Sequence, residues 1–154
     1  MKQIYVESIS LIERLHRRFL DVIKIELERL HIDDINNVQT LILYNISEDQ
    51  MTIGELTNRG YYLGSNVSYN VKKLVENGYL VQERAPHDKR STRIKLSDKG
   101  LDLCKKVDEL YQRNVDTLGE VSKPSLDKLS ELNETLNELE QFWSDYISNI
   151  YKIR

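Results

Sequence analysis

The stretch from residue 52 to residue 96 changes from helical to strand patterning, and this change restricts the fold more than any other feature of the chain. Thr52 and Glu55 form a capping box, in which each side chain bonds the backbone N–H of the other residue, so a helix is predicted to begin here. Gly60 ends this short helix, and a further helix is predicted over residues 65–77.

Two strands are predicted after this second helix. Gly78 suits the position just beyond the helix, where the backbone adopts a positive φ that glycine accepts without strain. Residues 79–81 and 92–96 have strand composition, and the second segment alternates apolar and polar side chains. Residues 85–91 lie between them and are too charged to be buried, which predicts a polar hairpin tip.

Two helices are predicted before this stretch. Residues 1–31 carry apolar side chains near helical spacing. Asn36 and Gln39 form a second capping box at the start of a helix over residues 37–46. That helix is almost wholly apolar on one side, so we expect it to cross the core.

Two long helices are predicted after the strands. Ser97 suits the N-cap of a helix that reaches about residue 122, and Pro124 suits the first turn of the last helix. Apolar side chains recur along the last helix at spacings of 3 and 4 residues, close to those of a coiled coil: Leu126, Leu129, Leu132, Leu136, Leu139, Trp143, Tyr146 and Ile150. One isolated helix cannot cover so many apolar side chains, and the pattern therefore predicts a partner.

Charge is distributed unevenly along the chain. The formal net charge is −3, which taken alone argues weakly against nucleic-acid binding. Residues 65–95 nevertheless hold seven Lys or Arg against three acids, whereas residues 124–154 hold three basic residues against six acids. A basic middle between less basic flanks is the pattern expected when one face meets phosphate.

No enzymatic constellation is present in the sequence, and no cofactor is predicted. His16, His31 and His87 lack ligand spacing, so no metal site is expected. Cys104 is interpreted as a small core residue, with oxidant sensing as the alternative. The sequence has no apolar run long enough to span a membrane, and its start lacks the uncharged core of a secretory signal, so a cytoplasmic location is expected.

The order of helix, turn, helix, strand, basic hairpin and strand predicts a winged helix-turn-helix domain that binds DNA. A helix fits the major groove, where polar side chains reach base edges, and a basic hairpin can contact the flanking minor groove or backbone. The predicted DNA-binding residues on the second helix of the motif are Ser65, Asn66, Ser68, Tyr69, Asn70, Lys72 and Lys73, and those on the hairpin are Asp88, Lys89, Arg90 and Arg93. The fold class is therefore mainly α (α+β), with a winged domain between long terminal helices.

Residues 64–100 resemble the core of the MarR family of bacterial transcription regulators. The resemblance rests on Val67-Ser68 with Val71 and Leu74, Glu76-Asn77-Gly78-Tyr79-Leu80, Asp88-Lys89-Arg90, and Leu96-Ser97 through Gly100. The long helices at both ends also fit, because proteins of this family dimerise through them. The resemblance therefore implies dimerisation helices over residues 1–34 and 101–154, and a DNA-binding domain over residues 35–100.

The resemblance also implies roles for particular residues. Arg90 would enter the minor groove, and Asp88 would orient it through a charge-assisted hydrogen bond. Tyr69 departs from the arginine often found at its position, and tyrosine cannot make a bidentate contact with guanine. This departure puts the base specificity in doubt, but not DNA binding itself.

Small aromatic or acidic effectors bind some proteins of this family in a crevice beside the dimerisation helices. Residues that could line such a site here are Thr40, Tyr44, Tyr61 and Tyr62, with core packing as the alternative for the two adjacent tyrosines. The preferred hypothesis is a homodimeric, effector-responsive regulator of a pseudo-palindromic operator in double-stranded DNA, with repression or activation left open. The alternative is a helical protein–protein interaction module that keeps a winged domain without binding DNA.

Overall fold

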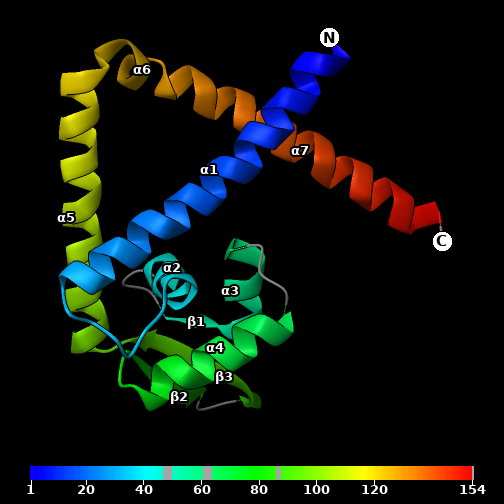
Figure 1. Cartoon of the computed structure of the whole chain (residues 1–154). Coiled ribbons are helices and arrows are strands. Elements are labelled where there is room, and N and C mark those ends of the chain that lie inside the picture. The colour runs from blue at the N-terminus through cyan, green and yellow to red at the C-terminus, as the bar shows by residue number, and fades with distance from the viewer. Residues whose placement is uncertain (47–49, 61–63, 86–87, 154) are drawn as a thin grey trace. The chain divides into compact units, whose positions relative to one another are not determined.

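The computed structural model describes residues 1–46, 50–60, 64–85 and 88–153, in two compact units, Met1–Asp108 and Glu109–Arg154. The elements follow the order α1 (Lys2–Arg29), α2 (Asn37–Ile46), β1 (Met51–Thr52), α3 (Ile53–Gly60), α4 (Gly64–Glu76), β2 (Leu80–Ala85), β3 (Asp88–Leu96), α5 (Asp98–Val121), α6 (Lys123–Asp127) and α7 (Leu129–Ile153) (Figure 1). This is a mainly helical chain with a small antiparallel sheet, and the predicted fold class is confirmed.

Both predicted capping boxes are present. At the start of α2, the Gln39 N–H donates to the Asn36 side-chain oxygen at 2.8 Å, and the Asn36 N–H donates to the Gln39 side chain at 3.1 Å. At the start of α3, the Glu55 N–H donates to the Thr52 hydroxyl oxygen at 3.1 Å, and the Thr52 N–H donates to the Glu55 carboxylate at 3.3 Å. These bonds satisfy N–H groups that a helix start would otherwise leave unpaired.

The end of α4 also follows the prediction. Gly78 has a φ of +82°, and its N–H donates to the Val75 carbonyl at 3.1 Å. The Tyr79 N–H donates to the Leu74 carbonyl at 2.9 Å, which completes a Schellman motif. The helix is therefore stopped within a single turn, and the chain passes directly into β2.

The sheet has the strand order β1-β3-β2, with β3 antiparallel to both neighbours. The two-residue strand β1, in which Met51 faces Ile94 and Thr52 faces Arg93, was not predicted from the sequence, where Thr52 was assigned only to a helix cap. Both long strands extend further than expected, and residues 88–91 belong to β3 and not to an irregular tip. Backbone hydrogen bonds to the neighbouring strand continue a strand past its last apolar side chain, so the alternating pattern underestimates its length.

The core of the first unit lies where α2, α3 and α4 pack over the sheet (Figure 1). Its fully buried side chains come from each of these elements: Ile42, Leu43, Ile46, Met51, Leu56, Val67, Val71, Leu74 and Ile94. As expected, α2 crosses this core, because Ile42, Leu43 and Ile46 are at most 1% exposed. Burial of a side chain of this size contributes about 1.5–3 kcal/mol.

Helix α5 begins at the predicted Ser97 cap, whose side-chain oxygen accepts a hydrogen bond from the Gly100 N–H at 3.1 Å. Its buried side chains in the first unit are Leu103 and Val107, whereas Leu101 is 40% exposed. Helical spacing alone therefore does not say which apolar residues of this helix meet the core.

The last predicted helix is divided in two. Pro124 lies in the first turn of α6, as expected, but Lys128 interrupts the helix before α7 begins at Leu129. Along these helices the predicted seam is largely exposed in the single chain, with Leu132 at 46% and Tyr146 at 59%. None of the helices that the structure describes is apolar over a stretch long enough for a bilayer.

Candidate DNA-binding surface

Helix α4 has an apolar face inside the first unit and a polar face toward solvent. Val67, Val71 and Leu74 are at most 1% exposed. On the other side Asn66, Ser68, Tyr69 and Lys72 are exposed, and Tyr69 has 61% of its surface free. The predicted outward orientation of these four residues therefore agrees with the structure. The buried face fixes the helix, so the exposed face is presented on a rigid support.

Asn70 is only half-buried and has a partner inside the protein. The Gln39 amide nitrogen donates to the Asn70 side-chain oxygen at 3.2 Å. The same Gln39 caps α2 through its side-chain oxygen, so one amide joins the start of α2 to α4. This bond uses one of the two lone pairs of the Asn70 amide oxygen, and it places Asn70 at the edge of the polar face.

Lys73 is the half-buried basic residue at the other edge of this face. Its ammonium nitrogen lies 5.9 Å from the centre of the Tyr69 ring and 3.4 Å from a Glu76 carboxylate oxygen. Both distances are long for strong interactions, and surface pairs of this kind contribute little to stability. The charge of Lys73 is therefore available to a phosphate group at small cost.

Basic side chains continue onto the sheet. Arg93 on β3 and Arg84 on β2 are both exposed. Lys95 is instead paired with Glu83, with 2.9 Å between the ammonium and the carboxylate. The hydrogen bond from Lys95 lowers the pKa of the Glu83 carboxyl, which is also bonded by Gln50 at 3.3 Å. Arg84 is absent from the predicted DNA-binding set, although the basic excess of residues 65–95 includes it.

Several predicted site residues have side chains outside the described part of the structure. The backbone of Ser65 lies in α4, and that of Asp88, Lys89 and Arg90 lies in β3, but their side chains are not described. The predicted orientation of Arg90 by Asp88 therefore remains a prediction. Tyr61 and Tyr62, which were expected near an effector site, also lie outside the described residues.

The other two predicted effector residues differ in accessibility. Thr40 is 1% exposed, and its hydroxyl donates to the Asn36 carbonyl at 2.8 Å. Thr40 is therefore enclosed in this structure, and its role at an effector site remains a prediction. Tyr44 is half-buried, and its hydroxyl donates to the Asp108 carboxylate.

Cys104 is half-buried on α5, and its sulfur lies 3.8 Å from the Leu43 carbonyl oxygen. Burial, together with the nearby Asp108 carboxylate, raises the pKa of its thiol to about 11. The thiol is therefore protonated near neutral pH, and the reactive thiolate is rare. This environment supports the interpretation of Cys104 as a structural residue.

The described residues contain no group of three or more His, Cys, Asp or Glu side chains that could hold a metal ion. What the first unit offers is a rigid helix with a polar exposed face, beside a hairpin that carries accessible arginines. Together these features define a winged helix DNA-binding protein. Residues 35–100 match the family described as a winged helix DNA-binding domain.

The chain is also similar to characterised proteins over most of its length. It is 35% identical over 144 residues to the exopolysaccharide II synthesis transcriptional activator ExpG of Rhizobium meliloti, covering 92% of this chain and 72% of that protein. Staphylococcus aureus MarR, solved with salicylate and kanamycin, has a TM-score of 0.75 at 23% identity, over 91% of this chain and 92% of that one. Streptococcus pneumoniae FabT, solved with DNA, has a TM-score of 0.73 at 17% identity, over 92% of this chain and 98% of that one.

The chain belongs to the MarR family of winged-helix regulators. It is a DNA-binding transcription regulator and not an enzyme. The resemblance inferred from residues 64–100 is thereby confirmed. The roles of individual side chains in DNA binding stay predictions.

Proposed function

We propose that the protein is a homodimer that reads a pseudo-palindromic DNA operator through the exposed face of α4. The observation that carries this proposal is the division of α4 into a buried face of Val67, Val71 and Leu74 and an exposed face that includes Asn66 and Tyr69. A helix held in this way can enter a major groove without first having to become ordered. Residues 35–100 would bind DNA, and residues 1–34 and 101–154 would dimerise.

The proposed interactions with DNA fall into two groups. Asn66, Ser68 and Tyr69 reach base edges or thymine methyl groups, whereas Lys72 and Lys73 bind phosphate as flexible point charges. On the wing, Arg90 enters the minor groove beside Lys89, with Asp88 as its support, and the accessible Arg84 and Arg93 hold the adjoining backbone. Ser65 and Asn70 complete the set at the start and the edge of α4.

Dimerisation is supported by the apolar side chains that the terminal helices leave exposed. On α7 these include Leu132, Tyr146 and Ile150, and on α1 they include Leu15 at 62% and Ile25 at 63%. Apolar faces of this length are unusual on a monomer in water. A second copy of the chain would cover them and would set two α4 helices about one DNA turn apart.

The proposed reading of bases is tested on a selected operator and on scrambled DNA at one salt concentration. Asn66→Ala and Tyr69→Ala should weaken operator binding by about 1–3 kcal/mol while leaving scrambled DNA largely unaffected. Lys73→Ala should weaken binding to both DNAs nearly equally, because phosphate contacts carry no sequence information. Lys105→Ala, which removes an exposed charge on α5, is the matched control.

Equal losses on both DNAs for Asn66→Ala and Tyr69→Ala would show that α4 does not read bases. The wing is tested separately, since Arg90→Ala should lower the slope of log affinity against log salt by roughly one unit for each phosphate that is no longer neutralised. Failure of the wild-type protein to bind any duplex would favour a protein–protein interaction module, the function that the net charge of −3 supports.

We further propose that a small aromatic or acidic effector modulates DNA binding. Staphylococcus aureus MarR has been solved with salicylate, and the half-buried Tyr44 is the described residue here that suits such a ligand. Tyr61 and Tyr62 would complete the site. Salicylate is the probe: it should lower the operator affinity of the wild-type protein, and Tyr44→Phe should reduce that response. An unchanged operator affinity with saturating salicylate would exclude this ligand class.

The proposed site of action is the cytoplasm, where DNA is accessible.

A further inference from the structure

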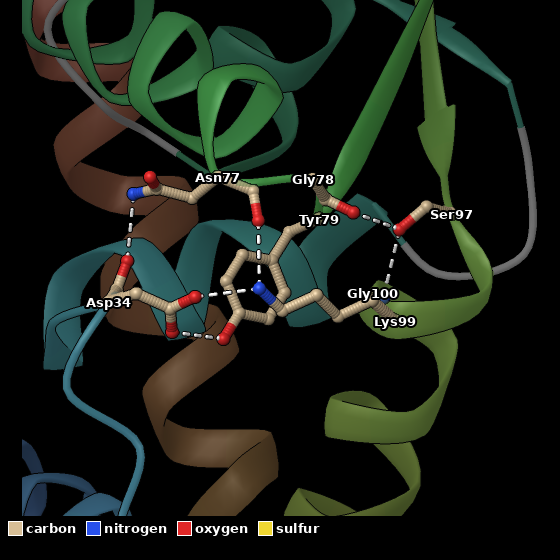
Figure 2. Close-up of polar contacts among 7 residues, drawn as sticks. All are labelled: Asp34, Asn77, Gly78, Tyr79, Ser97, Lys99 and Gly100. Atoms are coloured by element: carbon tan, nitrogen blue, oxygen red, sulfur yellow. Dashed lines mark hydrogen bonds and ion pairs between the residues drawn. The ribbon is translucent and has the colours of Figure 1, made fainter.

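A cluster of polar contacts joins three segments of the first unit that are distant in sequence. It consists of Asp34 from the loop between α1 and α2, Asn77 and Tyr79 from the turn between α4 and β2, and Lys99 from the first turn of α5 (Figure 2). We call it the Asp34 cluster. The Lys99 ammonium donates to the Asp34 carboxylate at 2.6 Å and to the Asn77 carbonyl at 2.8 Å.

Two further bonds converge on Asp34. The Asn77 side-chain amide donates to the Asp34 carbonyl at 2.8 Å, and the Tyr79 hydroxyl donates to the Asp34 carboxylate at 2.6 Å. Tyr79 is 2% exposed, and the Lys99 ammonium lies 4.2 Å from the centre of its ring. Lys99 therefore bonds the loop and the end of α4 at the same time and also packs on the aromatic ring between them.

A second set of contacts fixes α5 against the same point. The Ser97 hydroxyl donates to the Gly78 carbonyl at 2.6 Å, and the Ser97 N–H donates to the Tyr79 carbonyl at 3.0 Å. Gly100 lies so close that a Cβ atom there would be 2.3 Å from the Tyr79 carbonyl oxygen. The start of α5 and the end of α4 are thus in direct backbone contact, with no space for a side chain between them.

The Asp34 cluster is more than an exposed ion pair of the usual weak kind. The side chains of Asp34 and Lys99 are 38% and 49% exposed, so their charge interaction alone would be screened by solvent. Burial of Asp34 opposes its ionisation, but the hydrogen bonds from Lys99 and Tyr79 outweigh this and lower the pKa of the carboxyl. Asp34 accepts three hydrogen bonds, two at its carboxylate and one at its backbone carbonyl. Together they fix its position relative to the donors, which a single mobile ion pair does not do.

We propose that Asp34, Tyr79 and Lys99 are positioning residues that set the half-site spacing which the protein accepts on DNA. Helix α4 carries the proposed DNA-reading face, α1 lies within the N-terminal segment proposed to dimerise, and α5 leads into the C-terminal one. The cluster holds the end of α4 against the loop that follows α1 and against the start of α5. The proposal rests on the proposed function, because it concerns how the dimer presents its two α4 helices.

The test compares operators in which the two selected half-sites are moved apart or together by one base pair. The wild-type protein should bind the operator with the selected spacing at least about fivefold more tightly than the other two. About fivefold is the lower end of the coupling usually found between distant sites. Tyr79→Phe and Lys99→Met should bring the affinities for the three spacings closer together, while the affinity for scrambled DNA stays unchanged. Their combined effect should be smaller than the product of the single effects, because both act through Asp34.

Two variants serve as controls. Lys106→Met removes a Lys–Asp pair of the same type, in which Lys106 lies 3.0 Å from Asp102 one turn away on the same helix, and it should keep the wild-type spacing preference. Lys99→Arg keeps the charge and the ability to donate to both oxygens, and it should retain most of the preference. If Lys99→Met does not fold, Tyr79→Phe decides, because it removes one hydroxyl and leaves the buried ring in place.

The outcomes separate the two proposals. A wild-type protein that binds no duplex contradicts the proposed function. A wild-type protein that binds DNA without preferring a spacing overturns the positioning role. The positioning role is also overturned if Tyr79→Phe and Lys99→Met lower the melting temperature but keep the spacing preference of the wild-type protein. The Asp34 cluster would then only stabilise the fold.

Discussion

The winged region and the terminal helices both carry many apolar side chains, but these side chains are buried in the first region and largely exposed in the second. In the winged region Val67, Leu74 and Ile94 are at most 1% exposed, and the surrounding polar groups cap helices or join segments. On α1 and α7 comparable side chains remain exposed, with Leu15 at 62% and Tyr146 at 59%. A single chain therefore buries the apolar side chains of the first region, whereas those of the second region remain in contact with solvent.

This difference separates two kinds of stability. Substitutions inside the winged region should change the free energy of unfolding of one chain without changing which chains associate. Substitutions on the exposed seam should act on association first, because the side chains that they alter are only partly packed within their own chain. Four predictions, in decreasing order of the change expected, test this separation.

The largest effect is expected for Leu136→Glu combined with Leu139→Glu on α7. Two carboxylates on the seam would have to be desolvated on dimerisation, which costs several kcal/mol per ion. Sedimentation should show a dimer for the wild-type protein and a monomer or an unfolded chain for the double variant. Ser130→Glu with Asn137→Glu is the matched control, since both positions are exposed and lie beside the seam. A native monomer in the wild-type sample would contradict the proposed dimer.

The second prediction concerns the buried face of α4. Leu74→Ala should lower the free energy of unfolding by about 2–5 kcal/mol, because it leaves a cavity in a packed core. Denaturant titration measures this change. The same truncation at Leu101, which is 40% exposed in the same unit, should change it by no more than about 0.5 kcal/mol. If Leu74→Ala dissociated the dimer at a concentration where it remains folded, the separation between the two regions would be wrong.

The sequence was most informative where one short segment decides the structure. The capping boxes at Asn36 and Thr52 and the glycine at position 78 were all predicted, because each motif involves residues only a few positions apart. The polar side chains of α4 that were assigned to DNA, such as Asn66 and Tyr69, are exposed because helical spacing turns them away from the buried Val67.

The features that the sequence did not indicate depend on distant segments. Strand β1 exists because β3, much further along the chain, offers a free edge on which Met51 lies opposite Ile94. The Asp34 cluster joins residues 34, 79 and 99, which no local pattern relates. The helix break at Lys128 could not be predicted from residue type, because neither glycine nor proline occupies that position.

The third prediction concerns the cap at the start of α3. Thr52→Ala removes the hydroxyl that bonds the Glu55 N–H at 3.1 Å, and it should cost about 1 kcal/mol of unfolding free energy. Thr52→Ser keeps this acceptor and should lie close to the wild-type protein. Both variants should remain dimers in sedimentation. A loss of the dimer in Thr52→Ala would show that the cap contributes to association and not only to the stability of one chain.

The smallest effect is expected at Cys104, which lies on the part of α5 that belongs to the first unit. Burial and the Asp108 carboxylate raise the pKa of its thiol to about 11, so at pH 7 roughly one thiol in ten thousand is ionised. Since the thiolate is the reactive form, alkylation by iodoacetamide should be far slower than for an unstructured cysteine peptide, and its rate should rise steadily from about pH 7 to about pH 10. Cys104→Ala should bind the selected operator as the wild-type protein does, before and after treatment with hydrogen peroxide. A loss of operator binding on peroxide treatment in the wild-type protein, but not in Cys104→Ala, would instead make this thiol a redox switch within the self-contained region.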